Sequence, residues 1–167
     1  MSAQDKTEIH YKDLVESYYD KRSKTPLFIY DSFNGKIIDT LYNVEDKKSW
    51  YKIAITDSEY GWFKIKNIQR LPNAYINYGY ENRWVKTTNF LITVDDFDES
   101  HNIYLYDQPT IESNKIHKVD SNQTAKIIET SGLWVKIRFK VDKKFVEGWL
   151  SFKNQCAHPW TTCPETD

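Results

Sequence analysis

The few residues that could carry out covalent or metal chemistry lie mostly near the carboxyl end of the chain. Cys156 and Cys163 are its two cysteines, and they enclose His158. A thiol hydrolase of the Cys-His type needs a thiolate activated by an imidazole that a third group orients. Two cysteines and one histidine fall short of the four ligands of a structural zinc site. We expect a disulfide between Cys156 and Cys163 in an exported protein, with two reduced thiols as the alternative.

A run of acidic residues offers a second kind of chemistry. The four carboxylates in residues 95–99 are oxygen ligands of the kind that calcium prefers. The run lacks the glycine and the terminal glutamate spacing of a calcium-binding loop, so we interpret residues 95–101 as a solvated acidic linker. His10, His101 and His117 are scattered, and no glycine-rich phosphate cradle is present in the sequence. We therefore expect no metal, no cofactor and no catalytic residue, and the protein is predicted not to be an enzyme.

Aromatic residues are the remaining candidates, and they suit binding. Residues 73–80 contain three tyrosines, a residue type enriched at contact surfaces, so this insertion either meets a ligand or covers a seam between two halves of the protein. Residues 104–107 place two tyrosines on one strand face beside an aspartate. Aromatics in that position form either a ligand floor or part of a core. The predicted ligand-binding residues are Tyr75, Tyr78, Tyr80, Tyr104, Tyr106 and Asp107.

Composition restricts the fold and the partners. The 167 residues are 40% hydrophobic and 16% aromatic with only five glycines and one methionine, which favours sheets over helical bundles. The net charge is -1, and lysine and arginine are spread along the chain beside acidic residues, so no basic stripe is available for a nucleic-acid backbone. No apolar run approaches the roughly 18 residues of a transmembrane segment. We expect no nucleic-acid partner and no transmembrane segment.

The hydrophobic pattern predicts many short strands. Residues 134–141 alternate apolar and polar side chains with a period of two, and a polar turn leads to a second strand over 145–151. Residues 11–19 fit either a helical stripe or a short edge strand. Short strands with turn signals between them are typical of a sandwich or a small barrel. The same order of strands occurs twice, in blocks 28–31, 35–37, 52–56, 62–66 and 83–86, and again in 104–107, 114–116, 126–130, 134–138 and 148–151.

The second copy resembles a known family. Gly132-Leu133-Trp134-Val135-Lys136-Ile137 followed by Glu147-Gly148-Trp149-Leu150-Ser151 is similar to the bacterial Src-homology-3-like domain, and the paired arrangement resembles uncharacterised exported Bacteroidetes proteins. The first copy is looser, because Arg83 replaces the glycine before Trp84. The resemblance implies an all-β protein of two small Src-homology-3-like antiparallel β-barrels in tandem. The expected organisation is an N-terminal segment 1–25, a first domain 26–94, the acidic linker 95–101 and a second domain 102–167 with a C-terminal Cys loop.

Members of that family typically bind cell-wall peptides or partner proteins, often beside a separate hydrolase domain for which this chain has no room. The start, Met1-Ser2-Ala3-Gln4, looks like the end of a small-residue cleavage site with an added methionine, so we expect an exported protein, periplasmic or at the cell surface, with a cytosolic start as the alternative. The predicted function is non-catalytic recognition of a cell-envelope peptide, glycan-peptide or protein. The alternatives are a thiol cell-wall hydrolase and a structural or inhibitory protein that acts through protein contact.

Overall fold

The computed structural model describes residues 8–43, 48–71, 76–94 and 102–157. This part of the chain is all-β: its strands pair antiparallel, and its one helical element is the 3-10 turn η1 at Phe152–Asn154. The all-β prediction is therefore confirmed. The strands before residue 90 are β1 Val15–Tyr19, β2 Leu27–Tyr30, β3 Ile37–Leu41, β4 Trp50–Glu59, β5 Trp62–Leu71, β6 Ile76–Gly79 and β7 Trp84–Lys86. The later strands are β8 Phe90–Val94, β9 Ile103–Tyr106, β10 Lys115–Val119, β11 Thr124–Ser131, β12 Trp134–Val141, β13 Lys144–Leu150 and β14 Gln155–Cys156.

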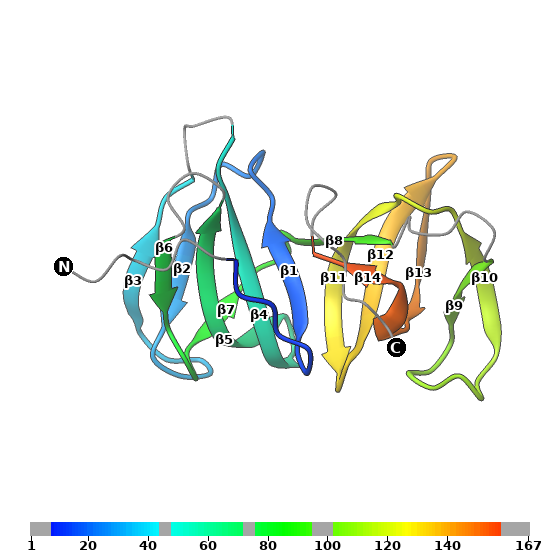
Figure 1. The fold of residues 1–167 in the computed structure, drawn as a ribbon, viewed down its shortest axis with the longest axis horizontal. Coiled ribbons are helices and arrows are strands. Elements are labelled where there is room, and N and C mark those ends of the chain that lie inside the picture. Colours follow the sequence, from blue (N-terminus) through cyan, green and yellow to red (C-terminus); the bar gives the residue numbers. More distant parts are fainter. Residues whose placement is uncertain (1–7, 44–47, 72–75, 95–101, 158–167) are drawn as a thin grey trace.

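One antiparallel sheet of 14 strands runs through the molecule, in the order β10-β9-β13-β12-β11-β8-β1-β4-β5-β7-β2-β3, with β14 beside β8 and β6 beside β5. We call β1 to β7 the first half and β8 to β14 the second half; they lie side by side (Figure 1). The central pair β1 and β8 joins the halves, through Tyr18 opposite Leu91 and Tyr19 opposite Phe90. Over the described residues the path ends at β10 and β3, so hydrogen bonds do not close it into a single barrel.

The two halves repeat one pattern of strand pairing. Outward from the centre, β1-β4-β5-β7-β2-β3 has the same order of pairing as β8-β11-β12-β13-β9-β10. The register agrees as well, because Tyr30 lies opposite Trp84 in the first half and Tyr106 lies opposite Trp149 in the second. The repeat therefore includes β1, from the predicted segment 1–25, and β8, from the predicted domain 26–94. The sheet continues across both boundaries.

A bulge recurs at the outer edge of each half. The register shifts so that Ile38 is the extra residue between β2 and β3, and Ile116 the extra residue between β9 and β10. Both isoleucines are exposed, at 48% and 49%. The sequence blocks had aligned Ile37 with Ile116, whereas the structure matches Ile38 with it. A bulge adds one residue to a single strand, which a pattern of alternating residues does not reveal.

The alternation predicted for residues 134–141 is present in β12. Val135, Ile137 and Phe139 are buried, whereas the side chains between them are half-buried or exposed. The hairpin to β13 turns through Asp142 and Lys143, which have φ values of 50° and 68°. Two successive positive φ values characterise a type I′ turn, whose twist matches that of the flanking strands. This turn forms without glycine, and its type was not evident from the sequence.

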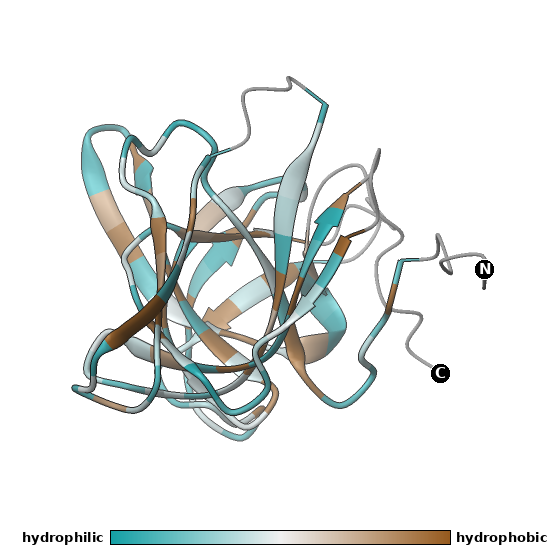
Figure 2. Cartoon of the chain, turned by 90° about the vertical axis from the view of Figure 1, so that its left-hand side faces the viewer, coloured by the Kyte–Doolittle hydropathy of each residue, from teal (hydrophilic) through white to brown (hydrophobic). Residues whose placement is uncertain are grey.

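The hydrophobic residues lie mainly on the strands, and the connections are more hydrophilic (Figure 2). Their buried side chains form one core cluster that extends through both halves. In β8 all five residues are buried, because the strand is covered on both faces. Phe90 of β8 packs edge-on against Phe63 of β5 and Tyr19 of β1, with ring centroids 5.1 and 6.2 Å away. The halves therefore share a core as well as a sheet.

A tight turn between β2 and β3 gives a first testable prediction. The Asp31 carboxylate accepts hydrogen bonds from the Lys36 N–H and the Ser32 hydroxyl, and a Cβ added at Gly35 would lie 2.0 Å from the same Asp31 oxygen. We expect Gly35→Ala to displace that carboxylate and to lower the free energy of unfolding by roughly 1–2 kcal/mol, the contribution of one or two such bonds. Urea denaturation measures the change. Because Asp31→Ala removes the same bonds, the double variant should cost less than the sum of the single variants, and strict additivity would contradict the explanation.

Candidate functional site

The tyrosines predicted for the second half lie on the outer side of β9. Ile103 and Leu105 are buried, whereas Tyr104 and Tyr106 are half-buried. The Lys115 ammonium group lies 4.6 Å from the centre of the Tyr104 ring, and the Tyr106 ring packs edge-on against Trp134 at 5.5 Å. These two tyrosines are thus outside the buried core cluster. Their assignment to a ligand stays a prediction.

Asp107 has a structural task at the turn that follows β9. Its carboxylate accepts hydrogen bonds from the main-chain and side-chain amides of Asn114, at 3.1 and 3.2 Å. The equivalent turn of the first half uses Asp31 and Lys36 in the same way. An aspartate that caps a turn in both halves has a sufficient reason for its position without any ligand.

Tyr78 and Tyr80, which the structure describes, belong to the first half and lie away from the junction of the halves. Tyr78 and Tyr80 stack with their ring planes 9° apart, and they cover part of the hydrophobic core from β6 and its end. The Tyr80 hydroxyl donates to Asp39 of β3. Burial and this negatively charged partner raise the pKa of Tyr80. These tyrosines do not cover the seam, because β6 pairs with β5 on the side remote from β8 (Figure 1). Tyr75 lies outside the described residues.

Cys156 lies on β14, which pairs with β8, and its side chain is 2% exposed. The sulfur of Cys156 is disulfide-bonded. A bridged sulfur is neither a thiolate nucleophile nor a metal ligand. Cys163 and His158 lie outside the described residues, so the pairing of Cys156 with Cys163 stays a prediction.

A hollow lies where the two halves meet. It is an open groove of about 930 Å³, which we call the central groove. Its walls come from the first half through the loops near Gly61 and Thr87, and from the second half through β11, β12 and β13. Its floor includes Leu91, Ile127 and Phe139. The cationic residues of the groove are Arg22, Lys126, Arg138 and Lys140.

The charges of the central groove do not cancel. Arg22 binds Asp20 through two hydrogen bonds of 3.1 Å, and Arg138 binds Glu147 at 2.8 and 2.9 Å. Although burial acts to raise it, hydrogen bonds from Arg22 hold the pKa of Asp20 below its usual value. The groove's two lysines have no ion pair with a carboxylate of the described residues. The residues that line the groove therefore include four cations, two of which are paired with carboxylates, and this excess of positive charge favours an anionic ligand.

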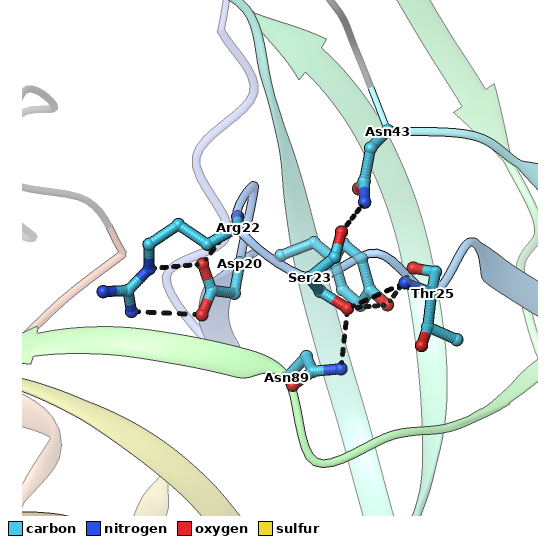
Figure 3. Close-up of polar contacts among 7 residues, drawn as sticks. Asp20, Arg22, Ser23, Thr25, Asn43 and Asn89 are labelled. Atoms are coloured by element: carbon cyan, nitrogen blue, oxygen red, sulfur yellow. Dashed lines mark hydrogen bonds and ion pairs between the residues drawn. The ribbon is translucent and has the colours of Figure 1, made fainter.

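A network of hydrogen bonds holds Arg22 at the edge of the groove. The loop after β1 is fixed by the main-chain N–H of Asp20, which donates to the Asn89 carbonyl at 2.9 Å, and by the Asn89 side chain, which donates to the Ser23 hydroxyl at 3.0 Å. Asn43 donates to the carbonyl of Ser23 from the opposite side. Figure 3 shows the Arg22 guanidinium directed away from this network, beside Asp20. The loop is therefore anchored while its cation stays accessible.

One aromatic ring marks the second-half side of the groove. Phe145 is 64% exposed, although it is a large apolar residue. The Lys140 ammonium group lies 5.0 Å from the centre of this ring and the Arg138 guanidinium carbon 5.6 Å from it. The contact between a cation and an aromatic face contributes about 0.5–1 kcal/mol at exposed sites, which helps to fix the ring and the cations in place. The arrangement offers an apolar face and positive charge to the same ligand.

A smaller pocket of about 510 Å³ adjoins the central groove, with which it shares Arg22, Leu91 and Thr124. Its aromatic residues are Tyr18 and Trp50, whose rings pack edge-on at 6.1 Å. Burial raises the pKa of Tyr18, so its hydroxyl stays a hydrogen-bond donor well above neutral pH. Together the two hollows form a continuous path along the junction of the halves.

The described residues contain no cluster of three or more His, Cys, Asp or Glu side chains placed to hold a metal ion. They also contain no helix with the length and apolar character needed to cross a membrane. The side chains that line the central groove offer electrostatic attraction, hydrogen bonding and apolar contact.

Comparison with known proteins adds little to this description. No family model and no curated protein sequence matches the chain. Two solved structures from Trichomonas vaginalis, NlpC2 and NlpC1, are similar at 13% and 12% identity, with TM-scores of 0.33 and 0.36. The matches cover 89% and 95% of this chain and 50% of each of those, so the chain spans half of their length. With TM-scores below 0.5, these likenesses carry no conclusion about fold or activity.

Proposed function

We propose that the protein is a non-catalytic, exported binding module that recognises a carboxylate-rich peptide of the cell envelope in its central groove. The observation that carries the proposal is the pair Lys126 and Lys140, two cations that form no ion pair with a carboxylate of the described residues and that lie beside apolar lining residues. A peptide with acidic and small apolar side chains matches such a surface. Glycan-peptides that carry the same carboxylates are included in this class.

Two further observations support the proposal. The repeated strand order and the matching Tyr30–Trp84 and Tyr106–Trp149 pairs favour two units of the same kind, which we propose to be Src-homology-3-like domains in tandem. The disulfide at Cys156 removes the residue that a thiol hydrolase of this chain would need as its nucleophile. A groove of about 930 Å³ lies near the upper end of the range for small-ligand sites, which suits a peptide of a few residues.

Charge reversal in the groove tests the proposal. We expect Lys126→Glu combined with Lys140→Glu to weaken binding of fluorescent cell-wall stem peptides at least tenfold, measured by anisotropy, because two attractive charges become repulsive. The wild-type affinity should also fall between 0.15 and 1 M salt, where the Debye length shrinks from about 8 to about 3 Å.

Exposed lysines outside the groove provide the matched control. Lys118→Glu with Lys153→Glu makes the same change in net charge, and this variant should bind as the wild type does. An equal loss of affinity in both double variants would show that only the overall charge matters and would contradict a site in the groove. Absence of stem-peptide binding by the wild type would contradict the proposal as a whole. Release of soluble fragments from purified cell wall by the wild-type protein would contradict its non-catalytic part.

A further inference from the structure

The residues that precede β1 cover a polar patch on the outer side of the sheet. Lys52 of β4 is only 3% exposed, and three oxygens surround its ammonium group: Glu8 Oε1 at 2.8 Å, the Ile9 carbonyl at 2.8 Å and Glu16 Oε2 at 2.5 Å. The ammonium group donates hydrogen bonds to Glu8 Oε1 and to the Ile9 carbonyl, and it forms an ion pair with Glu16. Two of these three oxygens belong to the covering segment, and only Glu16 belongs to the sheet.

The covering segment, Glu8–His10, is held by both main-chain and side-chain groups. The Ile9 N–H donates to Gln69 Oε1 of β5 at 3.0 Å, while the Ile9 carbonyl accepts from Lys52. The carboxylate of the preceding residue, Glu8, supplies the ion pair. The typical net contribution of one hydrogen bond is about 0.5–1.5 kcal/mol. A segment that is held by a few polar contacts can therefore be displaced by a peptide that makes the same contacts.

We infer that Glu16, Lys52 and Gln69 form a peptide-binding site that the chain's own segment Glu8–His10 occupies as an intramolecular ligand. The expected ligand is an extended peptide with a carboxylate side chain. The residue that follows the carboxylate residue binds through its main-chain N–H and its main-chain carbonyl. Lys52 selects for the carboxylate. Gln69 and Lys52 bind the main chain of the residue that follows the carboxylate residue, and such hydrogen bonds do not depend on the type of its side chain.

The site lies next to the pocket beside the central groove. Lys52 is the cross-strand neighbour of Tyr18, and Tyr18 and Trp50 line that pocket. The inference itself stands on the contacts of Lys52 and Gln69, and it is independent of the ligand proposed for the groove.

Release of the segment in the full chain tests the inference. Glu8→Lys places a cation against Lys52 and should free the site. The probe is the capped peptide of residues 8–14, Glu-Ile-His-Tyr-Lys-Asp-Leu, added to the ¹⁵N-labelled protein and followed by NMR. We expect the Glu8→Lys protein to bind the probe at least tenfold more tightly than the wild type, whose tethered segment competes at an effective concentration in the millimolar range. Amides of β1, β4 and β5 should shift.

Three controls make the result decisive. Asp13→Lys makes the same charge change on an exposed residue of the same segment and should bind the probe as weakly as the wild type does. The probe with glutamine in place of its glutamate should bind the Glu8→Lys protein at least tenfold less well. Ile9→Pro removes the N–H that Gln69 accepts and opens the site by a second route, should Glu8→Lys fail to fold. Folded open variants that do not bind the probe, or that bind it no better than the wild type does, would overturn the inference.

Discussion

Replacement of Lys52 by methionine should lower the free energy of unfolding at pH 8 by about 3–5 kcal/mol, the usual cost of removing one partner of a buried ion pair. The side chain of Lys52 is 3% exposed and that of Glu16 is 7% exposed. Methionine keeps much of the volume of the lysine side chain, so the loss reports on charge rather than on packing. The Glu16 carboxylate would remain buried without its cation. Urea denaturation followed by circular dichroism measures the change.

The loss should depend on pH in a defined direction. Burial raises the pKa of Glu16 above its usual value even with Lys52 beside it, and the pKa should rise further without that ammonium group. A carboxyl group whose pKa is higher in the folded protein binds more protons there, so stability falls as the pH rises through that pKa. The cost of Lys52→Met should therefore be smaller at pH 5 than at pH 8.

A second substitution identifies the cause. Glu16→Gln added to Lys52→Met should recover part of the lost stability, because no unpaired charge is then buried. Lys118→Met, a change at an exposed lysine of β10, should alter stability by less than about 0.5 kcal/mol. A cost below 1 kcal/mol for Lys52→Met, or an equal cost at both pH values, would contradict the importance of this ion pair.

Phe90→Ala should be equally severe for a different reason. Phe90 is fully buried on β8 and packs against Phe63 and Tyr19 of the first half. Truncation of a buried phenylalanine costs about 3–5 kcal/mol through lost apolar contacts and the cavity left behind. Because typical proteins are stable by only 5–15 kcal/mol, a large part of the total would disappear.

The same deletion at an exposed ring is the control. Phe145→Ala removes the same atoms from a side chain that is 64% exposed and should cost only about 0.5–1 kcal/mol, the contribution of the cations over its ring. In Phe90→Ala we expect one unfolding transition at lower urea concentration, since both halves share the core that is damaged. Two separate transitions in the wild type, or a similar cost for both variants, would contradict a shared core.

The sequence predicted the repeated strands of the two copies, but it did not predict how the copies join. Alternation in residues 134–141 predicted β12 correctly, and the Trp84 and Trp149 blocks matched because each tryptophan occupies the same place in a repeated strand. Residues 11–19 were left between a helix and an edge strand. Within this range Val15–Tyr19 form the central strand β1, which has partners on both sides, and Glu16 in the strand obscured its burial.

The candidate site was largely invisible in the sequence for a physical reason. The cations of the central groove come from a loop after β1 and from β11 and β12, and neither their spacing nor their neighbours distinguish them from other surface lysines. Lys52 follows two aromatic residues and precedes isoleucine, a pattern that predicts the strand but does not show that the lysine is buried. Tyrosine density directed attention to Tyr78 and Tyr80, whose rings stack over the core of the first half.

The pairing of β1 with β8 has a consequence for how the chain can be divided. These strands are separated by roughly seventy residues in sequence, so their contact forms only after a long loop has closed, and such non-local contacts slow folding. A cut between the copies would leave each fragment with an unpaired hydrogen-bonding edge, β1 on one and β8 on the other. Fragments of this kind tend to recombine or to aggregate. The duplicated units therefore make one cooperative body, and neither copy is a self-sufficient building block.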